Sequence, residues 1–220
     1  MDRNGKLVLT LVLLAVAVVV AVCAVSAATV LGPGAAPLAS LAGVLMGGVA
    51  WFGREFLREN DEKRRVCETY AAVIELQYNF LRVVLSDATI DRWRYLASDI
   101  AGGVEAESFG TRPDNLYPLL ADATPYLHLL RSDTIRLLSQ WHFMENDILS
   151  MWEDLGTRRI SSLGPTRVAA YYDEIKNYRR QYRDYAYSTL LALRAEGLEI
   201  DDYRLRTFEE DCAQDVRNPR

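Results

Sequence analysis

Histidine and cysteine are scarce in this chain of 220 residues, and their spacing suits neither a metal site nor a disulfide framework. There are two histidines and three cysteines, and Cys23, Cys67 and Cys212 lie far apart. Zinc sites use closer spacings such as Cys-x-x-Cys or His-Glu-x-x-His. His142 is followed three residues later by Glu145. Both residue types can bind a metal ion, but two ligands alone do not form a metal site. We therefore expect no metal and no cofactor.

Motifs that carry well-known chemistries are also missing. The chain has no Gly-x-x-x-x-Gly-Lys-Ser/Thr loop for phosphates and no Gly-x-Ser-x-Gly turn for a nucleophilic serine. It also lacks the Gly-x-Gly-x-x-Gly fingerprint of dinucleotide sites. Two carboxylates could still meet in a helical bundle and work as acid and base. Without a motif to support that chemistry, the sequence favours a protein that is not an enzyme.

A strong positive charge is missing as well, since the formal net charge is −5 at pH 7. General nucleic-acid-binding proteins show a basic excess that neutralises phosphates, so we expect no nucleic-acid partner. Arginine far outnumbers lysine, which occurs only at Lys6, Lys63 and Lys176. Together with the abundant alanine and valine, this bias is typical of a GC-rich bacterial genome.

Charged residues of either sign are absent from Leu7 to Phe52. A bilayer core about 30 Å thick takes about 20 apolar residues per crossing helix. The run is long enough for two crossings, at about residues 7–31 and 35–53, and Gly32-Pro33-Gly34 is a turn signal between them. The sequence therefore predicts a transmembrane hairpin with the lipid bilayer as a partner.

Basic residues flank this run on both sides, and they predict its orientation. Arg3 and Lys6 precede it, and Arg54 and Arg58 follow it, whereas the turn is uncharged. The positive-inside rule then places both termini in the cytoplasm. We predict a multi-pass protein of the bacterial inner (cytoplasmic) membrane with its hairpin in residues 1–53. A cleaved signal peptide and a re-entrant second segment are the alternatives.

Small residues recur every four positions on the second apolar run. Such a stripe lets helix backbones approach closely. It packs either against the first run of the same chain or against another copy. The stripe consists of Ala35, Ala39, Gly43 and Gly47.

The remainder of the chain has the pattern of long amphipathic helices. Neither glycine nor proline occurs between Arg54 and Gly102, and apolar residues there recur at three- to four-residue steps. Ser86 or Thr89, then Ser132, and finally Pro165 are helix-start signals. No strand pattern is present. We predict an all-α fold in which residues 54–196 form an antiparallel cytoplasmic bundle of about four helices after the hairpin.

Polar and acidic residues dominate positions 197–220. We expect a loosely ordered tail there. Apolar contacts from Ile200, Tyr203 and Leu205 could dock it on the bundle.

Tyrosine and arginine are concentrated in the last long helix. Four tyrosines, Tyr171, Tyr178, Tyr182 and Tyr185, are expected in the bundle core. Tyrosine and arginine on the flanks are typical of protein–protein hot spots, whereas stacking on single-stranded nucleic acid is the lesser alternative. The candidate partner surface consists of Tyr172, Arg179, Arg180, Arg183 and Tyr187.

These observations predict a membrane-anchored helical interaction module that holds a cytoplasmic partner, or another copy of itself, at the inner membrane. One alternative is a self-associating membrane effector of a defence or phage-exclusion type that perturbs the bilayer, an analogy of architecture only. A helical membrane-bound enzyme is a more remote alternative.

Overall fold

The computed structural model of the chain describes residues 11–12, 14–23, 25–26, 36–100, 117–155 and 163–217. Within these residues all regular structure is helical and no strand occurs. The predicted all-α fold class is confirmed to that extent. Two compact units divide the chain, Met1–Glu62 and Lys63–Arg220. The division comes nine residues after the boundary predicted at 53/54.

The predicted transmembrane hairpin is contradicted. In the described part of the chain, no helix has the length and apolar content that a membrane crossing requires. The second predicted span lies in helix α2, Ala36–Val84, which is rich in alanine and glycine at its start and continues without a break into Arg54 and the charged residues beyond it. Alanine and glycine contribute little apolar surface, so burying this run in lipid would yield little free energy. The predicted location in the bacterial inner membrane, with both termini in the cytoplasm, is therefore wrong. The Gly32-Pro33-Gly34 turn and both ends of the first predicted span lie outside the described residues.

Helix α2 supplies one wall of the bundle with its second half. Val66, Tyr70, Ile74, Tyr78 and Leu81 are buried at three- to four-residue steps, which is the spacing of one helix face. The helix ends just before Ser86. There the backbone N–H of Thr89 donates to Ser86 Oγ at 3.2 Å, which caps the N-terminus of the next helix.

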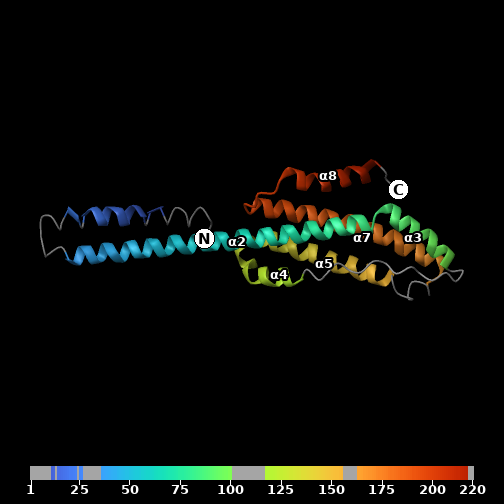
Figure 1. Ribbon diagram of the computed structural model, residues 1–220, viewed down its shortest axis with the longest axis horizontal. Coiled ribbons are helices and arrows are strands. Elements are labelled where there is room, and N and C mark those ends of the chain that lie inside the picture. Colours follow the sequence, from blue (N-terminus) through green and yellow to red (C-terminus); the bar gives the residue numbers. More distant parts are fainter. Residues whose placement is uncertain are drawn as a thin grey trace. The chain divides into compact units, whose positions relative to one another are not determined.

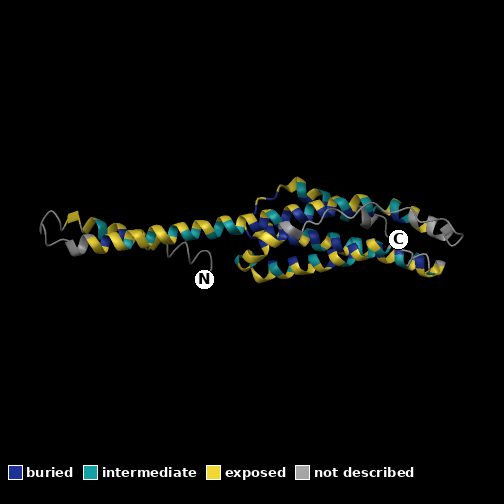
Figure 2. Cartoon of the chain, turned by 60° about the horizontal axis from the view of Figure 1, so that its bottom comes forward, coloured by how far each residue is buried: buried dark blue, intermediate teal, exposed yellow. Residues whose placement is uncertain are grey.

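The other bundle helices follow in chain order. They are α3 (Asp87–Ile100), α4 (Tyr117–Ala123), the 3-10 helix η2 (Thr124–Leu129), α5 (Ser132–Leu155), α7 (Pro165–Ala195) and α8 (Asp202–Arg217). Helices α5 and α7 pack along each other, and α3 and α8 also contact α7 (Figure 1). Buried residues line these helices, whereas the first part of α2 is mostly exposed or intermediate (Figure 2).

Helix α8 occupies the segment that the sequence led us to expect as a loosely ordered tail. Ile200 and Leu205 are buried, whereas Tyr203 is exposed. The ring of Phe208 stacks on Tyr78 of α2 with centroids 4.0 Å apart. Sequence reasoning missed this helix because acidic residues mask its apolar positions, which are spaced three residues apart.

The junction between α7 and α8 is a sharp, well-bonded turn. Gly197 has φ 105°, a left-handed conformation that favours glycine. The N–H of Gly197 donates to Arg194 O at 3.0 Å, and the N–H of Leu198 donates to Leu193 O at 3.3 Å. This pair of bonds is the Schellman motif, which satisfies the last carbonyls of a helix.

Glu196, just before that glycine, joins three helices. Its carboxylate accepts hydrogen bonds from Lys63 Nζ at 2.5 Å, from Thr134 Oγ1 at 2.7 Å and from the Arg131 backbone N–H and Nε at 2.9 and 3.0 Å. Burial alone would raise the pKa of Glu196, but these donors outweigh it and lower the pKa to about 2. The C-terminus of α7 is thereby fixed to α2 and to the start of α5.

Candidate functional site

Two surfaces carry the residues singled out in the sequence, one on the first part of α2 and one on α7. In the small-residue stripe, Ala35 lies outside the described residues and Ala39 lies in helix α2. Gly43 and Gly47 have open space, since a methyl group added at either would meet no atom within 4 Å. No neighbour in the described chain therefore requires a small residue at these two positions.

An apolar face, defined here as Leu41, Val44, Gly48 and Trp51, lies on the same part of α2. Its three large side chains are 51%, 72% and 61% exposed in chain order. The spacing of three, four and three residues is that of an a/d seam between paired helices. A methyl group added at Gly48 would also meet nothing within 4 Å, so the centre of the face is open to a close neighbour. Phe52, edge-on to Trp51 at 5.0 Å, extends it.

The tyrosine-rich part of α7 is rotated from its predicted phase. Tyr172 is buried and its pKa is raised to about 12 by that burial, so it belongs to the core and not to a partner surface. Tyr182 is fully buried, as predicted, whereas Tyr171, Tyr178 and Tyr185 are half-buried at the core edge. The buried positions fall at Val168, Tyr172, Ile175 and Tyr182, a stripe that the evenly spread tyrosines obscured.

Tyr187 lies at the seam with α8. Its hydroxyl donates to Glu209 Oε1 at 2.9 Å, and that bond, with burial, raises the pKa of Tyr187. The hydroxyl of Tyr187 is therefore engaged in a contact between α7 and α8.

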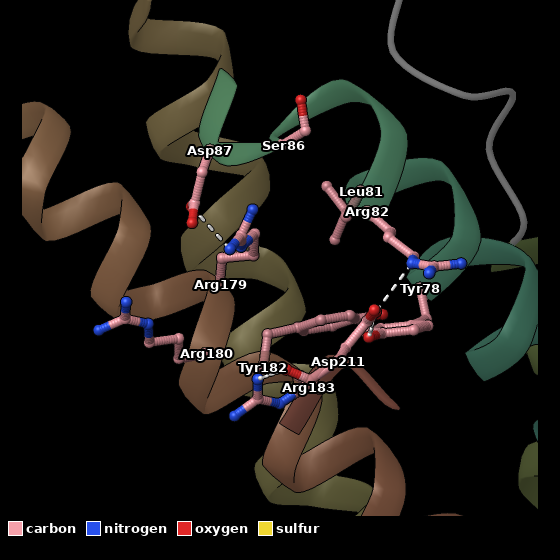
Figure 3. A pocket seen from close by; sticks show the side chains of 10 residues that line it. All are labelled: Tyr78, Leu81, Arg82, Ser86, Asp87, Arg179, Arg180, Tyr182, Arg183 and Asp211. Carbon is pink, nitrogen blue, oxygen red and sulfur yellow. Dashed lines mark hydrogen bonds and ion pairs between the residues drawn. The ribbon is translucent and has the colours of Figure 1, made fainter. Parts of the chain in front are cut away.

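The three predicted arginines of α7 line one pocket, together with a fourth arginine from α2. The pocket has a volume of about 250 Å³ and is built from helices α2, α7 and α8 and from the turn into α3 (Figure 3). Its charged lining consists of Arg82, Arg179, Arg180, Arg183, Asp87 and Asp211. Arginines therefore outnumber aspartates in the lining, although the side chain of Arg180 points away from the others (Figure 3).

Ion pairs order the two ends of this pocket. Arg179 donates to the Leu85 carbonyl at 2.6 Å and pairs with Asp87 at 2.8 Å. At the other end Arg82 pairs with Asp211 at 2.8 Å, and Arg183 Nη1 donates to the backbone carbonyl of Asp211 at 3.2 Å. Arg183 also pairs with its neighbour Asp184. Figure 3 shows Arg82 and Arg183 on either side of Asp211.

Two tyrosines complete the wall of the pocket. The Tyr78 hydroxyl donates to the Asp211 carboxylate, and burial followed by this bond raises the pKa of Tyr78 far above its usual value. Burial also raises the pKa of Tyr182. The indole N–H of Trp141 lies near the Tyr182 hydroxyl, but the two do not meet hydrogen-bond geometry, so both polar atoms are buried without a partner.

His142 and Glu145 meet as their spacing suggested. His142 Nδ1 lies 3.3 Å from Glu145 Oε2. In the described part of the chain no third histidine, cysteine or carboxylate joins them to form a metal-binding group.

Sequence reasoning found three of the four pocket arginines but missed Arg82, Asp211 and Tyr78. Tyr78 and Arg82 lie in α2, far before α7 in the chain, and Asp211 lies in the supposed tail. No local pattern connects them, because only the tertiary packing of α8 brings them together. Comparisons of the chain with protein-family models, with curated proteins and with solved structures find no match.

Proposed function

We propose that this protein is a helical interaction module that associates with a second copy of itself through the apolar face of α2. The observation that carries the proposal is the exposure of Leu41, Val44 and Trp51 on one side of an uncharged helical segment. Contiguous apolar surface of this kind marks an interaction site, because scattered apolar residues are ordinary but a patch is not.

The chemistry of the face favours another copy of the chain as its partner. From Leu11 to Gly53 the sequence holds no charged residue, so a partner must be apolar there. Every copy of the chain offers such a face. Fully burying one large aliphatic side chain is worth about 1.5–3 kcal/mol. Several such side chains from each copy are enough to drive pairing against the entropy of association, which costs about 4–15 kcal/mol.

The spacing of the face supports a helix pair in particular. Large residues three or four positions apart interlock between neighbouring helices, as knobs into holes. Gly48 lies in the middle of the face and leaves open space, which lets a second backbone come close at that point. These features favour a second copy of the chain over another protein as the partner.

The test is the molar mass of the full chain in solution, measured by sedimentation equilibrium over a range of concentrations. We expect the wild-type chain to form a dimer or a larger oligomer and Val44→Asp to shift it toward monomer, because a buried charge at a helix seam is costly. Val83→Asp is the matched control. Val83 belongs to the same helix and is 73% exposed, against 72% for Val44.

Val83→Asp should associate like the wild type. A wild-type chain that stays monomeric at every concentration contradicts the proposal. So does a Val44→Asp variant that associates as strongly as Val83→Asp.

A further inference from the structure

The geometry points to a binding site for a small, uncharged, largely apolar molecule with one hydrogen-bond donor, in a cavity between α2, α4 with η2, and α5. The cavity has a volume of about 340 Å³, and ligand pockets in proteins begin at about 300 Å³. Its lining residues lie in the unit Lys63–Arg220. The inference is therefore independent of self-association through the apolar face of α2.

Aliphatic side chains from three helical segments form the apolar wall of this cavity. Leu120 of α4 and Leu138 of α5 are buried, whereas Leu127 of η2 and Ile135 of α5 are only half-buried. The half-buried pair leaves apolar surface in contact with water. Removing such surface from water is favourable, so the body of a ligand that covers it is apolar.

The charge of the lining disfavours ionic ligands. Among the described residues that line the cavity there is no aspartate, glutamate, lysine or arginine. Burial raises the pKa of Tyr70, so this phenol is uncharged at neutral pH. His142 has Glu145, a residue outside the lining, as its partner at 3.3 Å. An ion would lose hydration in the cavity without gaining a counter-charge.

Two hydroxyl groups give the cavity hydrogen-bond acceptors. Thr124 Oγ1 donates to Leu120 O at 2.7 Å, and Ser139 Oγ donates to Ile135 O at 3.0 Å. A hydroxyl has a single hydrogen and two lone pairs. Because both hydrogens are used on backbone carbonyls, the two oxygens are left as acceptors, and a ligand with an N–H or O–H group suits them.

Ser139 is the better acceptor of the two. The Tyr70 hydroxyl lies near the side chain of Thr124 and competes for its oxygen. Ser139 is exposed on α5 and lines the cavity. We therefore assign the hydrogen bond from the ligand to Ser139 Oγ.

Isothermal titration calorimetry on the full chain tests the site with three probes that share one ring system. Indole is uncharged and has an N–H donor, 1-methylindole lacks that donor, and indole-3-carboxylate carries a negative charge. We expect indole to bind, 1-methylindole to bind about fivefold more weakly for want of one neutral hydrogen bond, and the carboxylate to bind at least tenfold more weakly. Absence of indole binding at millimolar concentration would overturn the inference, and so would equal affinities for indole and the carboxylate.

A variant that fills the cavity connects binding to this place. Ala121 lines the cavity and is exposed, so Ala121→Leu takes up space there without removing a core side chain. It should weaken indole binding at least tenfold. Ala88→Leu is the matched control, because Ala88 is an exposed alanine of α3 that does not line the cavity. Equal affinities of the two variants for indole would overturn the location.

Ser139→Ala tests the assigned acceptor. It should weaken indole binding about fivefold and leave 1-methylindole binding unchanged, whereas a general loss of structure would weaken both. Ser150→Ala is the control, because Ser150 is exposed on the same helix and lies outside the lining. A Ser139→Ala chain that prefers indole over 1-methylindole as strongly as the wild type would contradict the role of Ser139.

Discussion

Glu196 is a buried carboxylate, with 1% of its side chain exposed, whose charge is balanced by Lys63 and Arg131. Breaking such a pair leaves an uncompensated charge inside the protein. Glu196→Gln should lower the free energy of unfolding by about 3 kcal/mol, measured by urea denaturation. Glu199→Gln is the control, because Glu199 is exposed on the same turn, and it should change stability little. An equal effect of the two substitutions would show that Glu196 is not an anchor.

The lowered pKa of Glu196 also predicts the pH dependence of stability. The group is more acidic in the folded chain, at about 2 against an ordinary value of 4.5. Its contribution is therefore fully present above pH 4.5 and is lost as the pH falls toward 2. Denaturation between pH 6 and pH 2 should show a loss of roughly 3 kcal/mol from this group, and Glu196→Gln should lack that part. A variant that loses stability with acid as steeply as the wild type would contradict the assignment.

At the scale of single residues, sequence reasoning identified chemical types better than surroundings. Arg179, Arg180 and Arg183 were selected as a group for a partner surface, and the structure places all three in the lining of one pocket. Tyr172 was assigned to the surface and lies in the core. Tyrosines and aliphatic residues occur on several sides of α7 and compete for its buried face. A shift of a single residue rotates the predicted face by about 100°.

Gly197 fixes the direction in which the chain leaves α7. Its φ of 105° is costly for any residue with a Cβ, by about 1–2 kcal/mol. Gly197→Ala should lower the melting temperature by several degrees, measured by circular dichroism. Gly164→Ala is the comparison, because Gly164 has φ −64° and open space around it. A loss at Gly164 as large as that at Gly197 would contradict the left-handed turn as the cause.

Helix α8 is held to the bundle by a ring contact and by ion pairs. Phe208 is buried against Tyr78, and Arg204 pairs with Glu75 at 2.6 Å. Phe208→Ala should cost about 3–5 kcal/mol and should increase amide hydrogen exchange in α8 more than in α5. Phe143→Ala, at a 65% exposed phenylalanine, is the control and should leave exchange unchanged. Exchange in α8 that is already fast in the wild-type chain would contradict a docked helix.

Element boundaries were predicted well where local chemistry determines them. Ser86, Ser132 and Pro165 are start signals that act within one helical turn, and helices α3, α5 and α7 begin at or beside them. The segment of α8 has no comparable signal. Its apolar residues Leu205 and Phe208 are buried against the core, and Phe208 stacks on Tyr78. Local periodicity cannot predict a contact between residues more than a hundred positions apart.

At the scale of the whole molecule, the uncharged run from Leu7 to Phe52 predicted a transmembrane hairpin, and that prediction was wrong. An uncharged run predicts a membrane span only if each helix is also sufficiently apolar. Glycine and alanine extend the run in α2 without adding much apolar surface. The same part of α2 carries an exposed apolar face. Such a face can pack against another protein surface, and it is the basis of the proposed self-association.

Disulfide cross-linking of the full chain tests that self-association most directly. Single cysteines would replace Leu41, Val44 or Trp51 on the apolar face, in a chain whose Cys23 and Cys212 are changed to serine. Val83→Cys in the same background is the reference, because Val83 lies on the same helix and is 73% exposed, at least as much as each of the three positions on the face. We predict covalent dimers under mild oxidation from at least one position on the face and few from Val83. Equal dimer yields at Val83 and at all three positions on the face would contradict the proposed pairing through α2.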